Sequence, residues 1–185
     1  MSQISCVANA SITKLECNTC PLLTLEELKK ALVIVQDSHL CRRTPMLYNM
    51  QDLLTADATM HLHLKMESMQ PTGSFKVRGL ANQLANLPDN VKTGRSRLIT
   101  MSGGNYGKAF AYALSQMGLK GLVVMPTSVP TNRIELIEGF GMEVELVAKS
   151  EMMVCVNRHV KENGMTFLHS FDDPVIIAGH SSIGV

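Results

Sequence analysis

The sequence predicts an α/β fold built around a parallel sheet, and two patterns support this fold class. Apolar segments of about five residues alternate with longer segments that have helical spacing, which is typical of βαβ units. The segment 122–125, with the sequence LVVM, is apolar throughout, as expected of a parallel strand that is buried on both faces. At 185 residues, the chain is long enough for one domain or two small ones.

The first predicted helix begins at a capping box. Thr24 precedes Glu27 by three residues, so each side chain can bond to the other's backbone N–H, and apolar residues follow at helical spacing until Asp37. Pro, Gly or Asn residues end the later helices, and the segment 172–174, DDP, predicts an N-cap with Pro at the first position of a last helix. Strands are expected over residues 60–65, 97–101, 121–125, 143–147 and 165–169, and helices over 75–87, 105–117, 131–140 and 151–162.

The composition excludes several classes of protein. Lys and Arg number 17 against 16 Asp and Glu, a balance that lacks the clustered positive charge of a nucleic-acid binder. The 45% of apolar residues is enough for a packed core, yet no apolar run approaches the roughly 18 residues of a membrane span. Five irregularly spaced cysteines and no visible secretory signal favour reduced thiols and a cytoplasmic location. We therefore expect a globular protein with no nucleic-acid and no membrane partner.

Two short motifs have the spacing of metal ligands, but neither is complete. Cys17 and Cys20 form a C-x-x-C pair that no second pair answers, so two ordinary thiols are the favoured interpretation over a redox or metal pair. His61 and His63 would lie on one face of a strand, with no third ligand at a matching spacing. The sequence therefore predicts no metal site.

A glycine-rich loop joins the predicted strand at 97–101 to the helix at 105–117. Its sequence, SGGNYG over residues 102–107, includes three glycines, which let the backbone approach a ligand closely. In parallel sheets, ligands bind where such a loop leads into a helix, and the free N–H groups at the helix start attract an anion. The loop is therefore either a carboxylate or phosphate site or a tight turn that needs glycine for steric reasons alone.

A lysine stands in an unusual place, at the start of the helix predicted over 75–87. The positive charge of Lys76 is disfavoured there by the helix dipole, and its neighbours Phe75 and Val77 are apolar. Apolar surroundings lower the pKa of a lysine amine, which makes Lys76 a candidate for Schiff-base chemistry. The alternative is a surface lysine whose charged end reaches solvent.

Several motifs together resemble those of the fold-type II pyridoxal-phosphate enzymes, the family of the serine/threonine dehydratases and serine racemase. The segment 72–79, TGSFKVRG, resembles the cofactor-lysine motif of this family, and 102–107 is similar to its substrate loop. Three further pieces match in order and spacing, namely 43–46 (RTPM), 64–67 (LKME), and 171–174 (FDDP) followed by 179–183 (GHSSI). The resemblance implies the three-layer αβα fold with parallel sheets of the tryptophan synthase β-like family.

The resemblance also implies a role for each matching residue. Lys76 would bind pyridoxal 5′-phosphate as a Schiff base and then move the α-proton of the substrate. Phe75 would pack near the cofactor ring, and Asn105 would hydrogen-bond its 3′-oxygen. The loop residues that would hold the substrate carboxylate are Ser102, Gly103, Gly104, Asn105 and Tyr106. The implied reaction removes water from a hydroxy amino acid such as serine or threonine, and it yields a 2-keto acid and ammonia.

Two positions depart from the family pattern. Gly103 occupies the place of the serine that donates a proton in the racemase branch, and glycine has no proton to give, which favours a dehydratase over a racemase. Tyr106 replaces a more usual His or Ala. His180 would lie near the cofactor, where a hydrogen-bonded structural histidine is expected. The alternative to an enzyme is a non-catalytic protein that serves as a partner subunit.

The resemblance finally implies how the chain divides into domains. Residues 1–95 would form the N-terminal part of the large cofactor-binding domain, 96–168 a complete small domain, and 169–185 the start of the return to the large domain. Family members continue into a glycine-rich loop that binds the cofactor phosphate, so we expect this chain to be truncated. We expect a homodimer at full length, and neither tight cofactor retention nor turnover by the 185 residues alone.

Overall fold

The computed structural model describes residues 23–50 and 61–184, and a parallel sheet of four strands lies at its centre. In sequence order, the strands are β3 (Leu98–Met101), β4 (Gly121–Pro126), β5 (Glu143–Val147) and β6 (Thr166–Phe167). Their spatial order is β5-β4-β3-β6, and all three pairings are parallel. The predicted α/β class and its parallel sheet are therefore confirmed.

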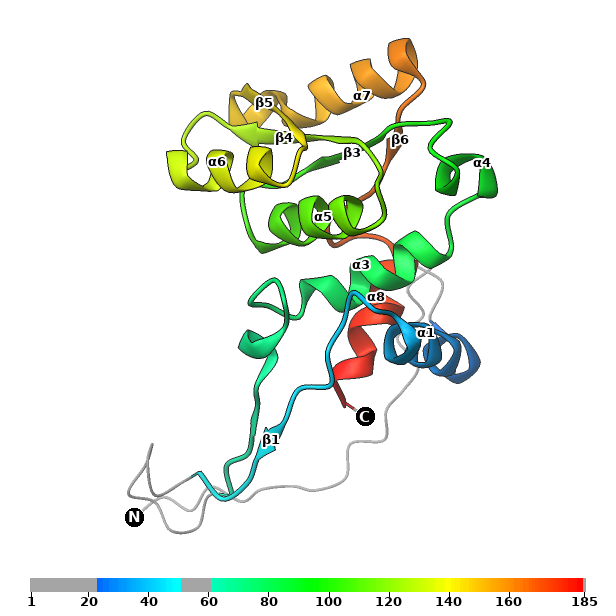
Figure 1. Cartoon of the computed structure of the whole chain (residues 1–185), viewed down its shortest axis with the longest axis vertical. Coiled ribbons are helices and arrows are strands. Elements are labelled where there is room, and N and C mark those ends of the chain that lie inside the picture. Colours follow the sequence, from blue (N-terminus) through cyan, green and yellow to red (C-terminus); the bar gives the residue numbers. More distant parts are fainter. Residues whose placement is uncertain (1–22, 51–60, 185) are drawn as a thin grey trace, which may run out of the picture.

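Helices cover both faces of this sheet (Figure 1). They are α5 (Asn105–Gln116) and α6 (Thr131–Gly139) on one face and α7 (Met152–Asn163) on the other. The central strand β4 supplies side chains to both layers, because successive residues of a strand point to opposite faces. Val123 is fully buried in the core on the α5 side, whereas Val124 is fully buried beside Val156 of α7. The three layers agree with the predicted αβα arrangement.

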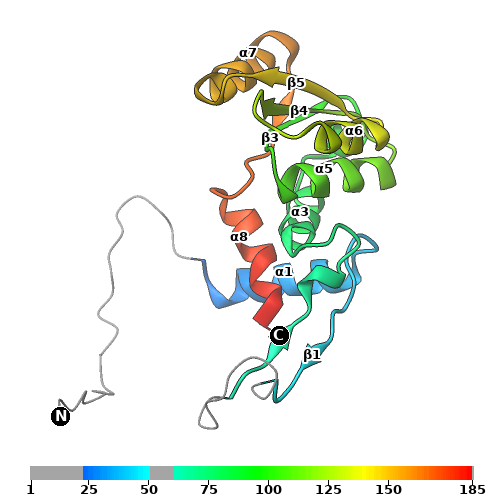
Figure 2. The ribbon, with the colours of Figure 1, turned by 90° about the vertical axis from the view of Figure 1, so that its left-hand side faces the viewer.

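A second group of helices packs below the sheet, next to α5 (Figure 2). It consists of α1 (Leu25–Asp37), α3 (Lys76–Ala85) and α8 (Pro174–Ser181). Helices α3 and α8 approach so closely that a Cβ added to Gly179 would lie 2.8 Å from Gly79 Cα and from the backbone oxygen of Arg78. This close approach joins the segment that carries Lys76 to the last helix of the chain.

The predicted N-terminal caps of α1 and α8 are both present. The backbone N–H of Glu27 donates to Thr24 Oγ1 over 3.2 Å, and the backbone N–H of Thr24 donates to Glu27 Oε2 over 2.7 Å, which completes the capping box of α1. Asp173 is the N-cap of α8 and accepts a 2.8 Å hydrogen bond from the N–H of Val175, with Pro174 at the first helical position. Both helices therefore begin where the sequence indicates.

The prediction of a strand over residues 60–65 is largely wrong. Within the described residues, only Leu64–Lys65 (β2) is extended and paired, and it pairs antiparallel with Met46–Leu47 (β1), so this pair is separate from the parallel sheet. His61 and His63 lie outside the strand, and His63 Nδ1 accepts a hydrogen bond from the N–H of Asn49. Residue 60 lies outside the described part of the chain.

Other differences from the prediction concern short elements and helix ends. The helix predicted over 75–87 ends at Ala85, and the strand predicted over 165–169 is reduced to two residues by its short pairing with β3. Among the described residues, the short elements that the sequence did not predict are strand β1, helix α4 (Asp89–Lys92) and the single 3₁₀ turns η1 (Glu67–Met69), η2 (Lys149–Glu151) and η3 (Ser182–Gly184). Among the described helices, none has the length and apolar character that crossing a membrane requires.

Candidate active site

Lys76 is the first residue of α3, directly after a turn that requires glycine. Gly73 has a φ of +72°, in the left-handed region that side chains disfavour. Lys76 is half-buried, and its Nζ lies 5.0 Å from the centroid of the Phe75 ring. Burial lowers the pKa of the Lys76 ammonium below its usual value. The structure thus places an amine that is easier to deprotonate than an exposed lysine at the start of a buried helix.

His180 of α8 lies next to Phe75 and close enough to Lys76 to be affected by its charge. Its ring packs edge-on against the Phe75 ring, with 4.9 Å between the centroids. Burial and the neighbouring charge of Lys76 lower the pKa of His180 to about 4, so the imidazole is neutral at pH 7. His180 Nε2 is buried and has no hydrogen-bond partner among the described residues, and the same holds for Ser74 Oγ. The expected structural histidine therefore lacks a hydrogen bond at Nε2, whereas a backbone hydrogen bond at Lys76 acts on the same imidazole.

The glycine-rich loop is held in shape by Ser102. Its N–H donates to the carbonyl oxygen of Val124 over 3.0 Å, which ties the loop to the end of β4. Its Oγ accepts from the N–H of Gly104 over 3.2 Å and from the N–H of Gly107 over 3.1 Å. A Cβ on Gly107 would lie only 2.7 Å from the backbone oxygen of Ser102, so this glycine is required by sterics. Part of the loop is accordingly a tight turn.

The remaining N–H groups of the loop are available to a ligand. Within residues 23–50 and 61–184, the N–H groups of Gly103, Asn105 and Tyr106 donate to no other group. Asn105 is the first residue of α5, where the helix dipole also favours negative charge, and its side chain is exposed. Arg133 of α6 donates to the carbonyl oxygen of Gly103 over 3.0 Å, so a cation stands at the loop as well. Both features favour an anion.

A cavity opens beside the start of α5. Its volume is about 200 Å³, and its polar lining includes Gly104, Asn105, Lys108 and Arg133. Two of these four residues are positively charged, which again favours a negatively charged ligand. A Cβ placed on Gly73 would lie 3.9 Å from Lys108 Nζ, so the turn that precedes Lys76 is a direct neighbour of α5. The fold therefore brings the two motifs together.

Tyr106 has its side chain in the core and not in the loop. The residue is only 3% exposed, and its hydroxyl donates a 2.6 Å hydrogen bond to Gln83 Oε1 on α3. Burial raises the pKa of Tyr106. Gln83 Nε2 donates in turn to the carbonyl oxygen of His169 and to Asp173 Oδ2, at the start of α8. The side chain of Tyr106 thus joins α5 to α3, and only its N–H remains near the loop.

A buried ion pair connects four of the motifs that the sequence singled out. Arg78 Nε lies 2.7 Å from Glu67 Oε2, and its second terminal nitrogen donates to Glu67 Oε1 over 2.8 Å. Arg78 also donates to Thr44 Oγ1 over 3.4 Å and to Ser182 Oγ over 3.3 Å. The side chains of Arg78 and Glu67 are only 7% and 13% exposed. These motif residues therefore hold the segments around Lys76 together.

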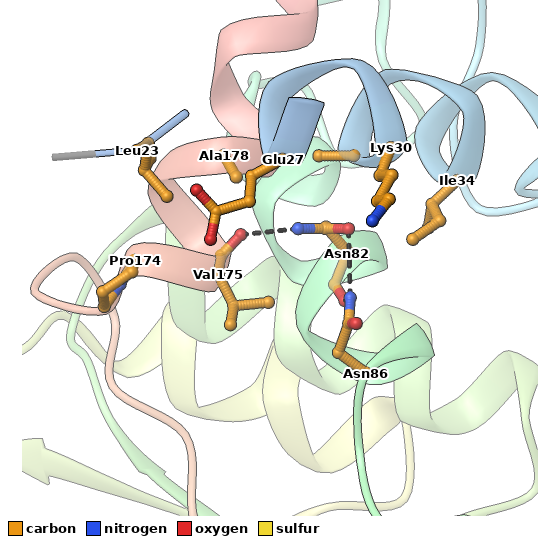
Figure 3. Close-up of a pocket in the computed structure, with 10 residues that line it drawn as sticks. Leu23, Glu27, Lys30, Ile34, Asn82, Asn86, Pro174, Val175 and Ala178 are labelled. Atoms are coloured by element: carbon orange, nitrogen blue, oxygen red, sulfur yellow. Dashed lines mark hydrogen bonds between the residues drawn. The ribbon is translucent and has the colours of Figure 1, made fainter. Parts of the chain in front are cut away.

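A second cavity lies in the groove between α1, α3 and α8 (Figure 3). Its volume is about 190 Å³, and none of the predicted site residues lines it. Asn82 Nδ2 donates to the carbonyl oxygen of Val175 over 2.7 Å, and Asn86 Nδ2 lies 3.2 Å from Asn82 Oδ1. The side-chain amides of both asparagines in this groove are thus already engaged in hydrogen bonds.

One cluster of potential metal ligands was missed by the sequence analysis. Glu145, Cys155 and His159 bring a carboxylate, a thiol and an imidazole within 4.8 Å of one another. The four-residue spacing of Cys155 and His159 on a predicted helix was the available signal, whereas Glu145 comes from a separate strand. The C-x-x-C pair, Cys17 and Cys20, lies outside the described residues.

Comparisons with known proteins show to which family the chain belongs. A family model described as pyridoxal-phosphate dependent enzyme matches residues 38–185. The catabolic L-threonine dehydratase of Staphylococcus aureus (strain USA300) is 32% identical over 169 residues, which are 90% of this chain and 47% of that protein. The crystal structure of the T.th. threonine deaminase is similar with a TM-score of 0.75 and 31% identity, over 88% of this chain and 50% of that one.

Racemases are also among the similar structures. Serine racemase from Dictyostelium discoideum has a TM-score of 0.72 and 29% identity, over 85% of this chain and 50% of that one. The chain thus spans about half the length of the curated relatives it matches. Since the family model covers most of the sequence and the fold agrees, this chain belongs to the family of pyridoxal-phosphate dependent enzymes.

Proposed function

We propose that the protein is a pyridoxal-phosphate dependent ammonia-lyase that acts on L-threonine or L-serine. The observation that carries the proposal is Lys76, a half-buried amine with a lowered pKa at the start of α3. The 32% identity to an L-threonine dehydratase and the similarity to a threonine deaminase support this substrate class. The substrate would lose its hydroxyl as water, and the imine that results would take up one water, which releases the nitrogen as ammonia and leaves a 2-keto acid.

The residues present fit both the cofactor and an amino acid. A pyridoxal ring needs an amine for its aldehyde and an apolar or aromatic neighbour, which Lys76 and Phe75 provide. The substrate carboxylate needs N–H donors, and in the 102–107 loop the N–H groups of Gly103 and Asn105 have no acceptor among the described residues. Ser74 Oγ, two residues before Lys76, is buried and has no partner among the described residues, as expected where a polar ligand is to bind.

In the mechanism that we propose, each residue has a defined task. When bound, pyridoxal phosphate would accept the electrons of the broken Cα–H bond into its ring. The Lys76 amine would hold the cofactor and carry the proton taken from Cα, and its partial burial lowers its pKa, which favours the neutral form. The N–H groups of Gly103 and Asn105 would bind the substrate carboxylate, and the Asn105 amide would orient the ring.

Racemisation is the competing reaction. It requires an acid on the face of Cα opposite to the lysine. Gly103 has no side chain to supply one, and a Cβ there would lie 3.2 Å from Pro126 Cδ, which leaves little room for a larger residue. We therefore favour elimination over racemisation, and we treat a non-catalytic subunit as a further outcome of the test.

The organisation of the whole protein belongs to the same proposal. We propose a small domain over residues 96–168 and a large domain that includes 1–95 and 169–185, because the parallel sheet falls entirely within the first of these ranges. We also propose that the whole protein is a homodimer. A location in the cytoplasm is consistent with Cys41 and Cys155, which are free thiols.

The test is a 2-keto acid assay on the native protein with pyridoxal phosphate and either L-threonine or L-serine. We expect keto acid from the unmodified protein and from the control Lys92→Ala, an exposed lysine, and none from Lys76→Ala. Undiminished keto acid from Lys76→Ala would refute the proposal. Formation of the D-amino acid without keto acid would identify a racemase, and a firmly bound cofactor without any product would indicate a non-catalytic subunit.

A further inference from the structure

We propose that Glu145, Cys155 and His159 form a binding site for a divalent transition metal of the Zn²⁺ type. The site lies on the α7 side of the parallel sheet, between α7 and the edge strand β5. It uses none of the residues assigned to the pyridoxal-phosphate site. The inference is therefore independent of the proposed function.

The fold brings the three side chains to one place. Cys155 and His159 are four residues apart on α7, so they project from the same face of the helix. Glu145 comes from β5, and its carboxylate oxygen Oε2 lies 2.6 Å from His159 Nε2. One ligand atom from each residue lies within 4.8 Å of the others. A tetrahedral Zn²⁺ with bonds of about 2.0–2.3 Å holds its ligands about 3.3–3.8 Å apart, so small side-chain rotations are sufficient to close the site.

Both ring nitrogens of His159 face an acceptor oxygen. Its Nδ1 lies 3.0 Å from Asn163 Oδ1, and its Nε2 lies 2.6 Å from Glu145 Oε2. Both partner atoms are acceptors, and a neutral imidazole has only one N–H to donate. A metal ion at Nε2 would satisfy the lone pair of that nitrogen and the carboxylate together. The Asn163 contact would then hold the ring in the required tautomer, as outer-shell partners of metal-bound histidines do.

The chemistry of the three ligands selects the kind of metal. Thiolate and imidazole are ligands of Zn²⁺ and related ions, whereas Ca²⁺ and Mg²⁺ prefer oxygen ligands alone. Cys155 is 6% exposed, and both Glu145 and His159 are half-buried, so the site is sheltered but within reach of solvent. Three protein ligands leave a fourth position for water.

Arg158 is the group that a metal would replace. Its terminal nitrogen donates to Glu145 Oε1 over 2.6 Å and lies 3.8 Å from Cys155 Sγ, so a positive charge already stands against two of the ligands. The Arg158 side chain is 51% exposed and can turn into solvent. A divalent ion at the three ligands would repel this guanidinium. Removal of the Arg158 charge should therefore strengthen metal binding.

The experiment measures binding of Zn²⁺, and of Co²⁺ as its spectroscopic substitute, to the 185-residue chain without pyridoxal phosphate. The chain carries Cys6→Ser, Cys17→Ser and Cys20→Ser, so that the remaining thiols are those of Cys41 and Cys155. We expect one equivalent of Zn²⁺ and a Co²⁺–thiolate absorption band. Loss of any one ligand should weaken binding by more than the roughly 10–100-fold cost of losing an outer-shell partner.

Four substitutions decide the outcome. Cys155→Ala, His159→Gln and Glu145→Gln should each weaken binding, and Cys155→Ala should abolish the Co²⁺ band, whereas the control His39→Gln, an exposed histidine, should change neither. Arg158→Gln lies on the surface and leaves all three ligands in place, and it should lower the Kd for Zn²⁺. No stoichiometric binding, binding that survives Cys155→Ala, or an unchanged Kd in Arg158→Gln would overturn the proposal.

Discussion

Replacement of Arg78 by methionine should expose the energetic role of the buried ion pair that joins the motifs. In the native protein, burial alone would raise the pKa of Glu67, but hydrogen bonds from Arg78 and Thr44 hold that pKa below its usual value. Arg78→Met removes the compensating charge and leaves the Glu67 carboxylate buried. Removing one partner of a buried pair typically costs about 3–5 kcal/mol, which is a large part of the roughly 5–15 kcal/mol that stabilises a domain.

The pH dependence of this cost has a definite sign. In the native protein, the lowered pKa of Glu67 stabilises the fold above pH 4.5 and ceases to do so as the pH falls through the folded-state value. In Arg78→Met, burial raises the pKa of Glu67, so the carboxyl destabilises the fold at pH 7 and is relieved by protonation. The stability difference between the two proteins should therefore shrink as the pH falls from 7 toward 4.5.

Urea unfolding followed by circular dichroism at several pH values measures this difference. Glu67→Gln/Arg78→Met should recover much of the lost stability, because no buried charge remains. Lys30→Met is the matched control, since Lys30 pairs with Glu26 at 2.8 Å while both side chains are at least 70% exposed, and it should cost less than about 1 kcal/mol. A cost of Arg78→Met that does not change with pH, or no recovery in the double variant, would refute the reasoning.

Three further variants test the packing around the site by urea unfolding. His180 has a folded pKa of about 4 against 6.5 unfolded, so its contribution to stability should be lost as the pH falls from 6.5 to 4, and His180→Leu should remove that loss. Gly79→Ala should cost about 1–3 kcal/mol, because the added Cβ would press on the His180 ring, and an unchanged stability would contradict the close packing. Tyr106→Phe should cost about 1–3 kcal/mol by leaving Gln83 Oε1 buried without its donor, whereas Tyr112→Phe, a half-buried tyrosine, should cost less.

The predicted elements that proved most accurate have local signals. The capping box at Thr24 and the Asp173-Pro174 helix start depend on residues within one helical turn, so the sequence contains the whole interaction. The strand at 121–125 was predicted from a continuous apolar run, which depends only on burial. The prediction over 60–65 was wrong because pairing decides the extent of a strand, and β2 has only the two residues of β1 as its partner.

The candidate site could be predicted only in part, for a related reason. Lys76 and the loop at 102–107 are recognisable in the sequence by helix position and glycine content. The side-chain direction of Tyr106 and the partnerless Nε2 of His180 depend on how α3, α5 and α8 pack, which no spacing in the sequence reveals. The Glu145 cluster likewise unites a strand and a helix that meet only in the folded sheet.

The most direct test of the central claim is to locate the lysine that binds the cofactor. The native protein would be incubated with pyridoxal phosphate and reduced with borohydride, and the labelled peptide would be identified by mass spectrometry. The account predicts one label on Lys76, no label in Lys76→Ala, and no change in Lys108→Ala, which removes the neighbouring amine at the loop. A label that stays in Lys76→Ala, or one that resides on Lys108 in the unmodified protein, would contradict the account.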